Sequence, residues 1–336
     1  MDAVEAVLVA EVRLGPVSRV RPLAGQRWLV QRALGELVVL DERLTPNWRL
    51  ELPTGRPGIV ALADDLSLVA VSRAGQLVLL DGSGRQLASV LATPSGSSAG
   101  IFTADGAYLW VVLPGLGSET PTPASQEVWL LDVATRSLLD RCRVGLFVDD
   151  RPPIRHPDGR TVGLSLWVDG RAAIGWAVAE RGRIDLRLCP WRDFVLADVQ
   201  PAGSEYLTVS RTQGLVRAQP GVYGREDVLL RLRLGDDRPV GALMVSAATH
   251  GDDVWEPQSG YLANDLIVAG TVDTGRHLLV GTAPMGLLAE VVNPSPIGGS
   301  VPIPSGQGTW LTVGGGRVQH WMLPPLPGEQ LQLPLT

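Results

Sequence analysis

The chain has 336 residues, of which 45% are hydrophobic and 19% charged, with a formal net charge of −6. This composition supports a large buried core and argues against a disordered chain. All 29 basic residues are arginine and they form no basic block, so nucleic acid is not an expected partner. The N-terminus lacks a signal-peptide pattern and no apolar run reaches the length of a membrane span, which predicts a cytoplasmic protein with no membrane partner.

Seven segments along the chain share one pattern, a tight turn followed by a strand. The turns are rich in small, acidic and glycine residues, as hairpin turns require, and the apolar residues after them alternate with a period of two. In chain order the segments are PLAGQRWLVQ (22–31), LADDLSLVAVS (62–72), TADGAYLWVV (103–112), HPDGRTVGLSL (156–166), QPAGSEYLTVS (200–210), VDTGRHLLVGT (272–282) and IPSGQGTWLTV (303–313).

A second pattern follows the first three of these segments, a hairpin of two strands around an aspartate-led turn. The aspartates are Asp41, Asp81 and Asp132, and their spacings of 40 and 51 residues bracket the length of a four-stranded propeller blade. The two patterns predict an all-β fold, a single closed β-propeller over residues 1–336 with seven four-stranded blades. Counts of six or eight blades stay open. A sandwich, a β-helix or a doubly wound fold fits the repeat less well.

Naming the strands of a blade a to d from the axis outward, we expect the glycine-containing turn to join a to b in every blade. The aspartate-led turn would then join c to d. Only 31 residues separate Gly275 from Gly306, so the sixth blade is expected to be short. Residues 6–14 are a candidate for the outer strand of the last blade, and residues 331–335 compete for that place.

Two segments carry a resemblance to a known family. HPDGRTVGLSL (156–166) and GQLVLLDGSGRQL (75–87) resemble the repeats of bacterial tryptophan-aspartate-repeat-like β-propellers, where a proline-aspartate-glycine turn precedes strand b and an aspartate ends strand c. The Trp-Asp ending and the Gly-His signature of those repeats are missing here. The resemblance implies the propeller fold and no specific activity.

The longest irregular segments predict where the protein binds. We assign residues 114–126, 145–158, 211–226 and 247–263 to b-to-c and d-to-a connections, which emerge on one face of a propeller. Long loops on a rigid scaffold commonly carry binding residues. The candidate partner-binding residues in these loops are Arg151, Arg155, His156, Asp252, Asp253, Trp255 and Glu256.

These residues have simpler interpretations as well. The charges around Arg155 and His156 fit a proline-stiffened, self-paired loop, and Trp255 fits equally a binding anchor or a cover over the end of the blades. One histidine and irregularly spaced carboxylates do not predict a metal site. Cys142 and Cys189 predict no disulfide.

We therefore predict a non-catalytic, protein-binding propeller, a scaffold or regulatory subunit of a bacterial complex that recognises another protein through its loop-rich face. No catalytic residue, cofactor or metal ligand is assigned. Two alternatives stay open: a lactonase-like, metal-dependent hydrolase with its site at the channel mouth, and a binder of a small ligand or sugar in the channel.

Overall fold

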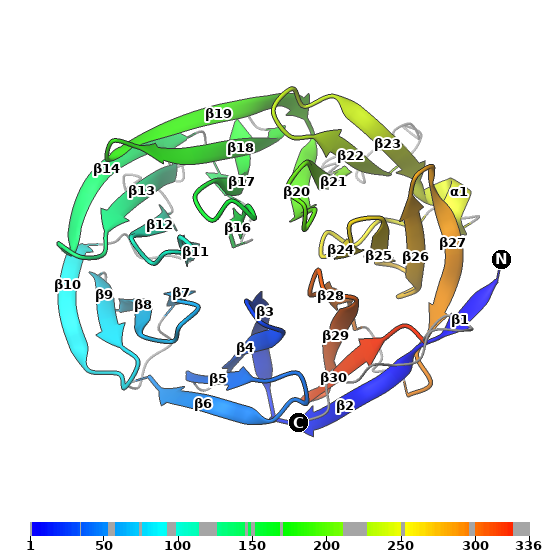
Figure 1. Cartoon of the computed structure of the whole chain (residues 1–336), viewed down its shortest axis with the longest axis horizontal. Coiled ribbons are helices and arrows are strands. Elements are labelled where there is room, and N and C mark those ends of the chain that lie inside the picture. Colours follow the sequence, from blue (N-terminus) through cyan, green and yellow to red (C-terminus); the bar gives the residue numbers. More distant parts are fainter. Residues whose placement is uncertain are drawn as a thin grey trace, which may run out of the picture.

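Seven β-sheets stand around a central axis in the structure, which is a computed structural model (Figure 1). Each contains at least four strands, so the described residues form a seven-bladed β-propeller, as predicted. The described residues are 2–33, 35–52, 58–73, 76–92, 99–113, 126–144, 147–148, 152–168, 171–210, 227–249, 253–295 and 300–324.

The first four blades follow the chain, each from its innermost to its outermost strand. Blade one contains β3 (Val17–Leu23), β4 (Arg27–Arg32), β5 (Glu36–Leu40) and β6 (Pro46–Glu51). Blade two contains β7 (Gly58–Leu62), β8 (Leu68–Arg73), β9 (Gln76–Asp81) and β10 (Gln86–Ala92). Blade three contains β11 (Ala99–Phe102), β12 (Tyr108–Leu113), β13 (Gln126–Asp132) and β14 (Ser137–Val144). Blade four contains β16 (Ile154–Arg155), β17 (Val162–Val168), β18 (Arg171–Glu180) and β19 (Arg183–Arg192), and β15 (Phe147–Val148) also pairs with β17.

The last three blades complete the ring. Blade five contains β20 (Phe194–Val199), β21 (Glu205–Ser210), β22 (Val228–Arg233) and β23 (Pro239–Met244), followed by the helix α1 (Val245–Thr249). Blade six contains β24 (Gly260–Ala263), β25 (Leu266–Gly270), β26 (His277–Thr282) and β27 (Met285–Val292), with β1 (Ala3–Glu5) added outside β27. Blade seven contains β28 (Ile303–Pro304), β29 (Thr309–Gly314), β30 (Arg317–Met322) and β2 (Val7–Arg13). In the part of the chain described, no helix is long and apolar enough to span a membrane.

The middle strands of the blades are buried on both faces, because each sheet packs between two neighbouring sheets. Residues 37–40 of β5 are all buried, and so is every residue of β26. Such strands read as continuous apolar runs, whereas an outer strand such as β19 alternates between exposed and covered residues. The core clusters lie between blades: one joins Leu79 of blade two to Phe102 and Val111 of blade three. Blade packing therefore supplies the core of the fold.

The predicted turn chemistry is present in the a-to-b and c-to-d turns. Gly106 and Gly159 lie in a-to-b turns with φ of 67° and 76°, a backbone conformation that favours glycine. In a c-to-d turn, the Asp41 carboxylate accepts hydrogen bonds from the backbone amides of Arg43 (2.9 Å) and Thr45 (2.8 Å). The local sequence of each turn thus closes its own hairpin.

Blade six differs from the prediction. The glycine-containing turn at 271–276 joins β25 to β26, which is a b-to-c connection, and the a-to-b turn is formed by Asn264 and Asp265. This two-residue turn has no glycine, so it lacks the pattern by which the a-to-b turns of the other blades were predicted. Blade six is therefore not short, because it begins at β24, well before Gly275. The Ala202 amide donates to the Asn264 side-chain oxygen (2.9 Å), which ties the a-to-b turns of blades five and six together.

The N-terminal segment closes the ring. Strand β2 pairs antiparallel with β30 and forms the outer strand of blade seven, as predicted for residues 6–14. Strand β1 pairs parallel with β27 of blade six, so the segment joins two blades (Figure 1). The competing residues 331–335 lie outside the described residues.

Candidate functional site

A cavity of about 760 Å³ lies in the central channel, and residues from all seven blades or their connections line it. This volume falls in the range of ligand pockets, about 300 to 1,000 Å³. Much of the wall is apolar, with Leu62, Ile101 and Leu196 among its residues. The charged residues are therefore the distinctive part of the lining.

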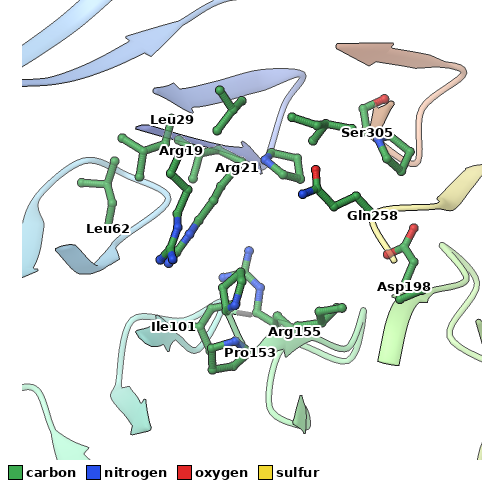
Figure 2. A pocket seen from close by; sticks show the side chains of 18 of the residues that line it. Arg19, Arg21, Leu29, Leu62, Ile101, Pro153, Arg155, Asp198, Gln258 and Ser305 are labelled. Atoms are coloured by element: carbon green, nitrogen blue, oxygen red, sulfur yellow. The ribbon is translucent and has the colours of Figure 1, made fainter. Parts of the chain in front are cut away.

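Three arginines line one region of the cavity wall. Arg19 and Arg21 occupy alternate positions of β3, so their side chains leave the strand on the same side, and Arg155 ends β16. Figure 2 shows the Arg19 and Arg21 side chains running together into the cavity, with the Arg155 guanidinium directed toward the same region in this view. We call these three residues the arginine cluster.

The surroundings of Arg21 desolvate its guanidinium group. Its guanidinium Nη1 donates to the Gly100 carbonyl oxygen of blade three at 3.5 Å, a long hydrogen bond. Burial lowers the pKa of Arg21 to about 9, and the like charge of Arg19 contributes to this decrease. The guanidinium is still charged at neutral pH, so two neighbouring positive charges face the cavity.

Arg155 is held by contacts that cross three blades. Its Nη2 forms an ion pair with the Asp64 carboxylate in the a-to-b turn of blade two, and its Nη1 donates to the Phe102 carbonyl oxygen of blade three (3.2 Å). The Arg27 side chain of blade one donates to the Asp64 carbonyl oxygen (2.6 Å). These contacts fix the position of the Arg155 guanidinium at the cavity wall.

Asp198, Gln258 and Ser305 form a polar region on another part of the wall (Figure 2). The Asp198 carboxylate accepts hydrogen bonds from the backbone amides of Val199 (2.8 Å) and Tyr261 (2.7 Å). Burial nevertheless raises the pKa of Asp198 to about 7, because desolvation of the charge outweighs these bonds. The backbone is close here: a Cβ on Gly260 would lie 2.4 Å from Asp198 Oδ2.

The structure describes five of the seven residues predicted from the loops and places them in different surroundings. Arg155 and Glu256 line the cavity. His156 packs at the turn instead: its Nε2 lies 2.8 Å from the Gly203 carbonyl oxygen, and its ring is nearly perpendicular to that of Trp176, with the two centroids 6.5 Å apart. Arg151 and Asp252 lie outside the described residues.

Trp255 and Asp253 belong to the core between blades five and six. Trp255 is fully buried, and its indole donates to the Leu243 carbonyl oxygen (3.3 Å). Asp253 is buried as well and accepts hydrogen bonds from the amides of Val254 and Asp273 (2.9 Å each). The Trp255 indole is therefore part of the core, and both side chains are shielded from solvent.

Sequence reasoning missed Arg19, Arg21 and Asp198. The first two lie in a strand of mixed apolar and charged residues, VSRVRPL, where arginines at alternate positions are a signal of a polar strand face. Among the described residues, no group of three or more His, Cys, Asp and Glu side chains is arranged to hold a metal ion. Cys142 and Cys189 are both free thiols.

Comparison with known proteins supports the fold and no narrower identity. No family model matches the chain, and no curated protein matches it in sequence. A solved structure of hydrazine synthase from Kuenenia stuttgartiensis aligns with a TM-score of 0.62 at 12% identity, over 92% of this chain and 95% of that chain. The β-propeller domain of Myceliophteria thermophila Cps50 (Swd1) aligns with a TM-score of 0.63 at 11% identity, over 95% and 100%. The Dos1 propeller aligns with a TM-score of 0.54 at 16% identity, over 92% and 78%. The chain thus has a WD-repeat-like β-propeller fold.

Proposed function

We propose that this protein is a non-catalytic, protein-binding propeller whose partner covers the loop-rich face and the adjoining mouth of the central channel. One observation carries the proposal: two of the long predicted loops, 145–158 and 247–263, contribute residues to the cavity lining. These are Pro152, Pro153, Ile154 and Arg155 from the first loop, and Glu256, Pro257 and Gln258 from the second. The described ends of these two loops are therefore part of the cavity wall.

The chemistry of this surface suits protein recognition. Each d-to-a connection leads from the rim of a blade to an inner strand, so its last residues lie beside the channel. Prolines at 152, 153 and 257 restrict the backbone there, which lowers the conformational entropy lost on binding. The fixed arginine and the exposed Gln258 add polar contacts. We assign the protein a role as scaffold or regulatory subunit of a bacterial cytoplasmic complex.

The proposal is tested by affinity purification from the native host with a variant that blocks the channel mouth. Gln258→Trp adds a large side chain at an exposed position and should leave the stability of the fold unchanged. The matched control is Arg85→Ala, in the c-to-d turn of blade two. The c-to-d turns emerge on the face of the propeller opposite to the loop-rich face. We expect a stoichiometric protein partner with the wild type and the control, and loss of that partner with Gln258→Trp.

Two results would contradict the proposal. One is a partner that is retained by Gln258→Trp at the wild-type ratio. The other is the absence of any stoichiometric protein partner from the wild-type preparation. Thermal unfolding of all three proteins, measured in parallel, shows whether a lost partner reflects a blocked surface or a damaged fold.

A further inference from the structure

The N-terminal segment forms the outer edge of the ring at blades six and seven. Strand β1 pairs only with β27 and β2 only with β30, and the described residues place no strand outside either of them. The Ala6 amide between them donates to the Val292 carbonyl oxygen (2.9 Å), so residues 3–13 run as one extended segment along this rim (Figure 1). An outermost strand presents a row of backbone amide and carbonyl groups with which another strand can pair.

Apolar side chains are exposed along this edge. Val7, Leu8 and Val9 follow one another in β2 and are 40%, 38% and 40% exposed. The pairing of β2 with β30 passes from Leu8 to Ala10 and omits Val9, so Val9 lies at a β-bulge. Three consecutive exposed apolar residues on an outermost strand favour the addition of a further strand, because pairing removes them from water.

Other outer strands carry features that oppose such pairing. Strand β19 of blade four contains Pro190 and has charged residues at both ends, Arg183 and Arg192, and β6 of blade one begins with Pro46. Proline lacks the amide that a neighbouring strand needs, and charged side chains discourage the approach of a second edge. Residues 3–13 contain no proline, so their edge is not protected in this way.

The charges of the segment are complementary to those of a second copy in one antiparallel register. Glu5 and Arg13 lie four positions on either side of Val9, both are exposed, and neither has an ion-pair partner among the described residues. If two copies pair about a two-fold axis at Val9, Glu5 of each chain lies opposite Arg13 of the other. Moving the axis to Leu8 would instead place Glu5 opposite Glu11 of the second copy, which is repulsive. The charges therefore select one register.

We propose that residues 3–13 pair antiparallel with the same residues of a second copy of this chain, so that two propellers form a symmetric dimer joined edge to edge. A two-fold interface requires a surface that is complementary to itself, and this segment has an apolar centre with opposite charges on its two sides. The edge belongs to outermost strands, so the dimer leaves the central cavity open. The inference goes beyond the proposed binding of a partner protein at the channel mouth and does not depend on it.

The test is sedimentation equilibrium of the whole chain at low ionic strength, which gives the dissociation constant of the dimer. We expect a reversible equilibrium between monomer and dimer for the wild type. Glu5→Arg and Arg13→Glu should each weaken the dimer by about tenfold or more, because two symmetry-related ion pairs become contacts between like charges. The variant with both substitutions restores opposite charges and should return to within about threefold of the wild-type constant. The control, Arg183→Glu at the exposed end of β19 in blade four, should dimerise as the wild type does.

Val9→Asp gives a second, independent measurement, since it places two carboxylates at the two-fold axis and should abolish the dimer. Thermal unfolding of each variant shows whether its fold is intact, and Val9→Asp decides if a charge-reversal variant fails to fold. A wild type that stays monomeric at every concentration would overturn the proposal. A dimer that the charge reversals leave unchanged, or that the double variant does not recover, would overturn it as well. If a chain ending at Pro324 dimerises while the full chain does not, residues 325–336 cover the edge and the proposal is wrong.

Discussion

Because the carboxyl group of Asp198 is desolvated, we expect the free energy of unfolding to decrease as the pH rises from about 4 to about 7. Burial raises the pKa of this group from 3.8 to about 7 in the folded chain. Between these values the folded chain keeps the proton and the unfolded chain has released it, so a rise in pH favours unfolding. At about 1.4 kcal/mol per pH unit, the whole interval corresponds to about 4 kcal/mol, and the part from about pH 5 to about pH 7 to roughly 2 to 3 kcal/mol.

The substitution Asp198→Asn isolates this group, because the amide stays uncharged at every pH. The asparagine keeps only one of the two acceptor oxygens that the Val199 and Tyr261 amides use, but this loss is independent of pH and does not alter the slope. Urea unfolding followed by tryptophan fluorescence gives the free energy of unfolding at about pH 5, 6, 7 and 8. The free energy of unfolding of the wild type minus that of the variant should fall by about 2 to 3 kcal/mol between about pH 5 and pH 7 and then level off.

A matched control is Asp185→Asn on the exposed surface of β19, which should leave the pH dependence of the wild type unchanged. The reasoning about Asp198 is refuted if the difference between wild type and Asp198→Asn stays constant to within about 0.5 kcal/mol across the same range, or rises with pH.

Three further predictions concern the fold that holds the site. Trp255→Ala should lower the free energy of unfolding by about 3 to 5 kcal/mol, since the side chain is fully buried; an unchanged urea midpoint would mean that the indole is not part of the core. Gly260→Ala should lower the free energy of unfolding by about 1 to 3 kcal/mol, because the new Cβ would lie 2.4 Å from Asp198 Oδ2 and 2.5 Å from Pro304 Cγ. A variant with the melting temperature of the wild type would contradict this close packing. Deletion of residues 2–13 removes β1 and β2 and should expose the edge of β30. We expect the truncated protein to associate in a concentration-dependent way in size-exclusion chromatography. A monomer of wild-type stability would argue against closure of the ring by the N-terminal segment.

Most blades could be predicted from sequence because local turn chemistry specifies their hairpins. The Asp41 carboxylate caps the turn that its own hairpin needs, and Gly106 supplies a positive φ where its own turn requires one. Blade six shows the limit of such a signal. The turn at Gly275 has the same composition as the other predicted turns, but composition does not say which two strands a turn joins.

The candidate site could be predicted only in part, since it is assembled from segments far apart in the chain. Arg155 and Glu256 were predicted as candidates because they belong to long loops, and both line the cavity. Arg19 and Asp198 lie in short inner strands, and only closure of the ring brings those strands around one channel. Trp255 lies among acidic residues in sequence, but the blades packed on both sides of it decide its burial.

The pairing of β2 with β30 has a consequence for the order in which the protein folds during synthesis. Gln319 donates to the Glu11 carboxylate (2.7 Å) across 308 positions of the chain, so β2 is synthesised before the other strands of its sheet and can pair only after β30 has been made. Until then the apolar residues Val7, Leu8 and Val9 have no neighbouring strand to join. Nascent chains should therefore accumulate as an open arc of blades, and the time spent in that state, rather than the stability of any one blade, would set the demand for chaperones.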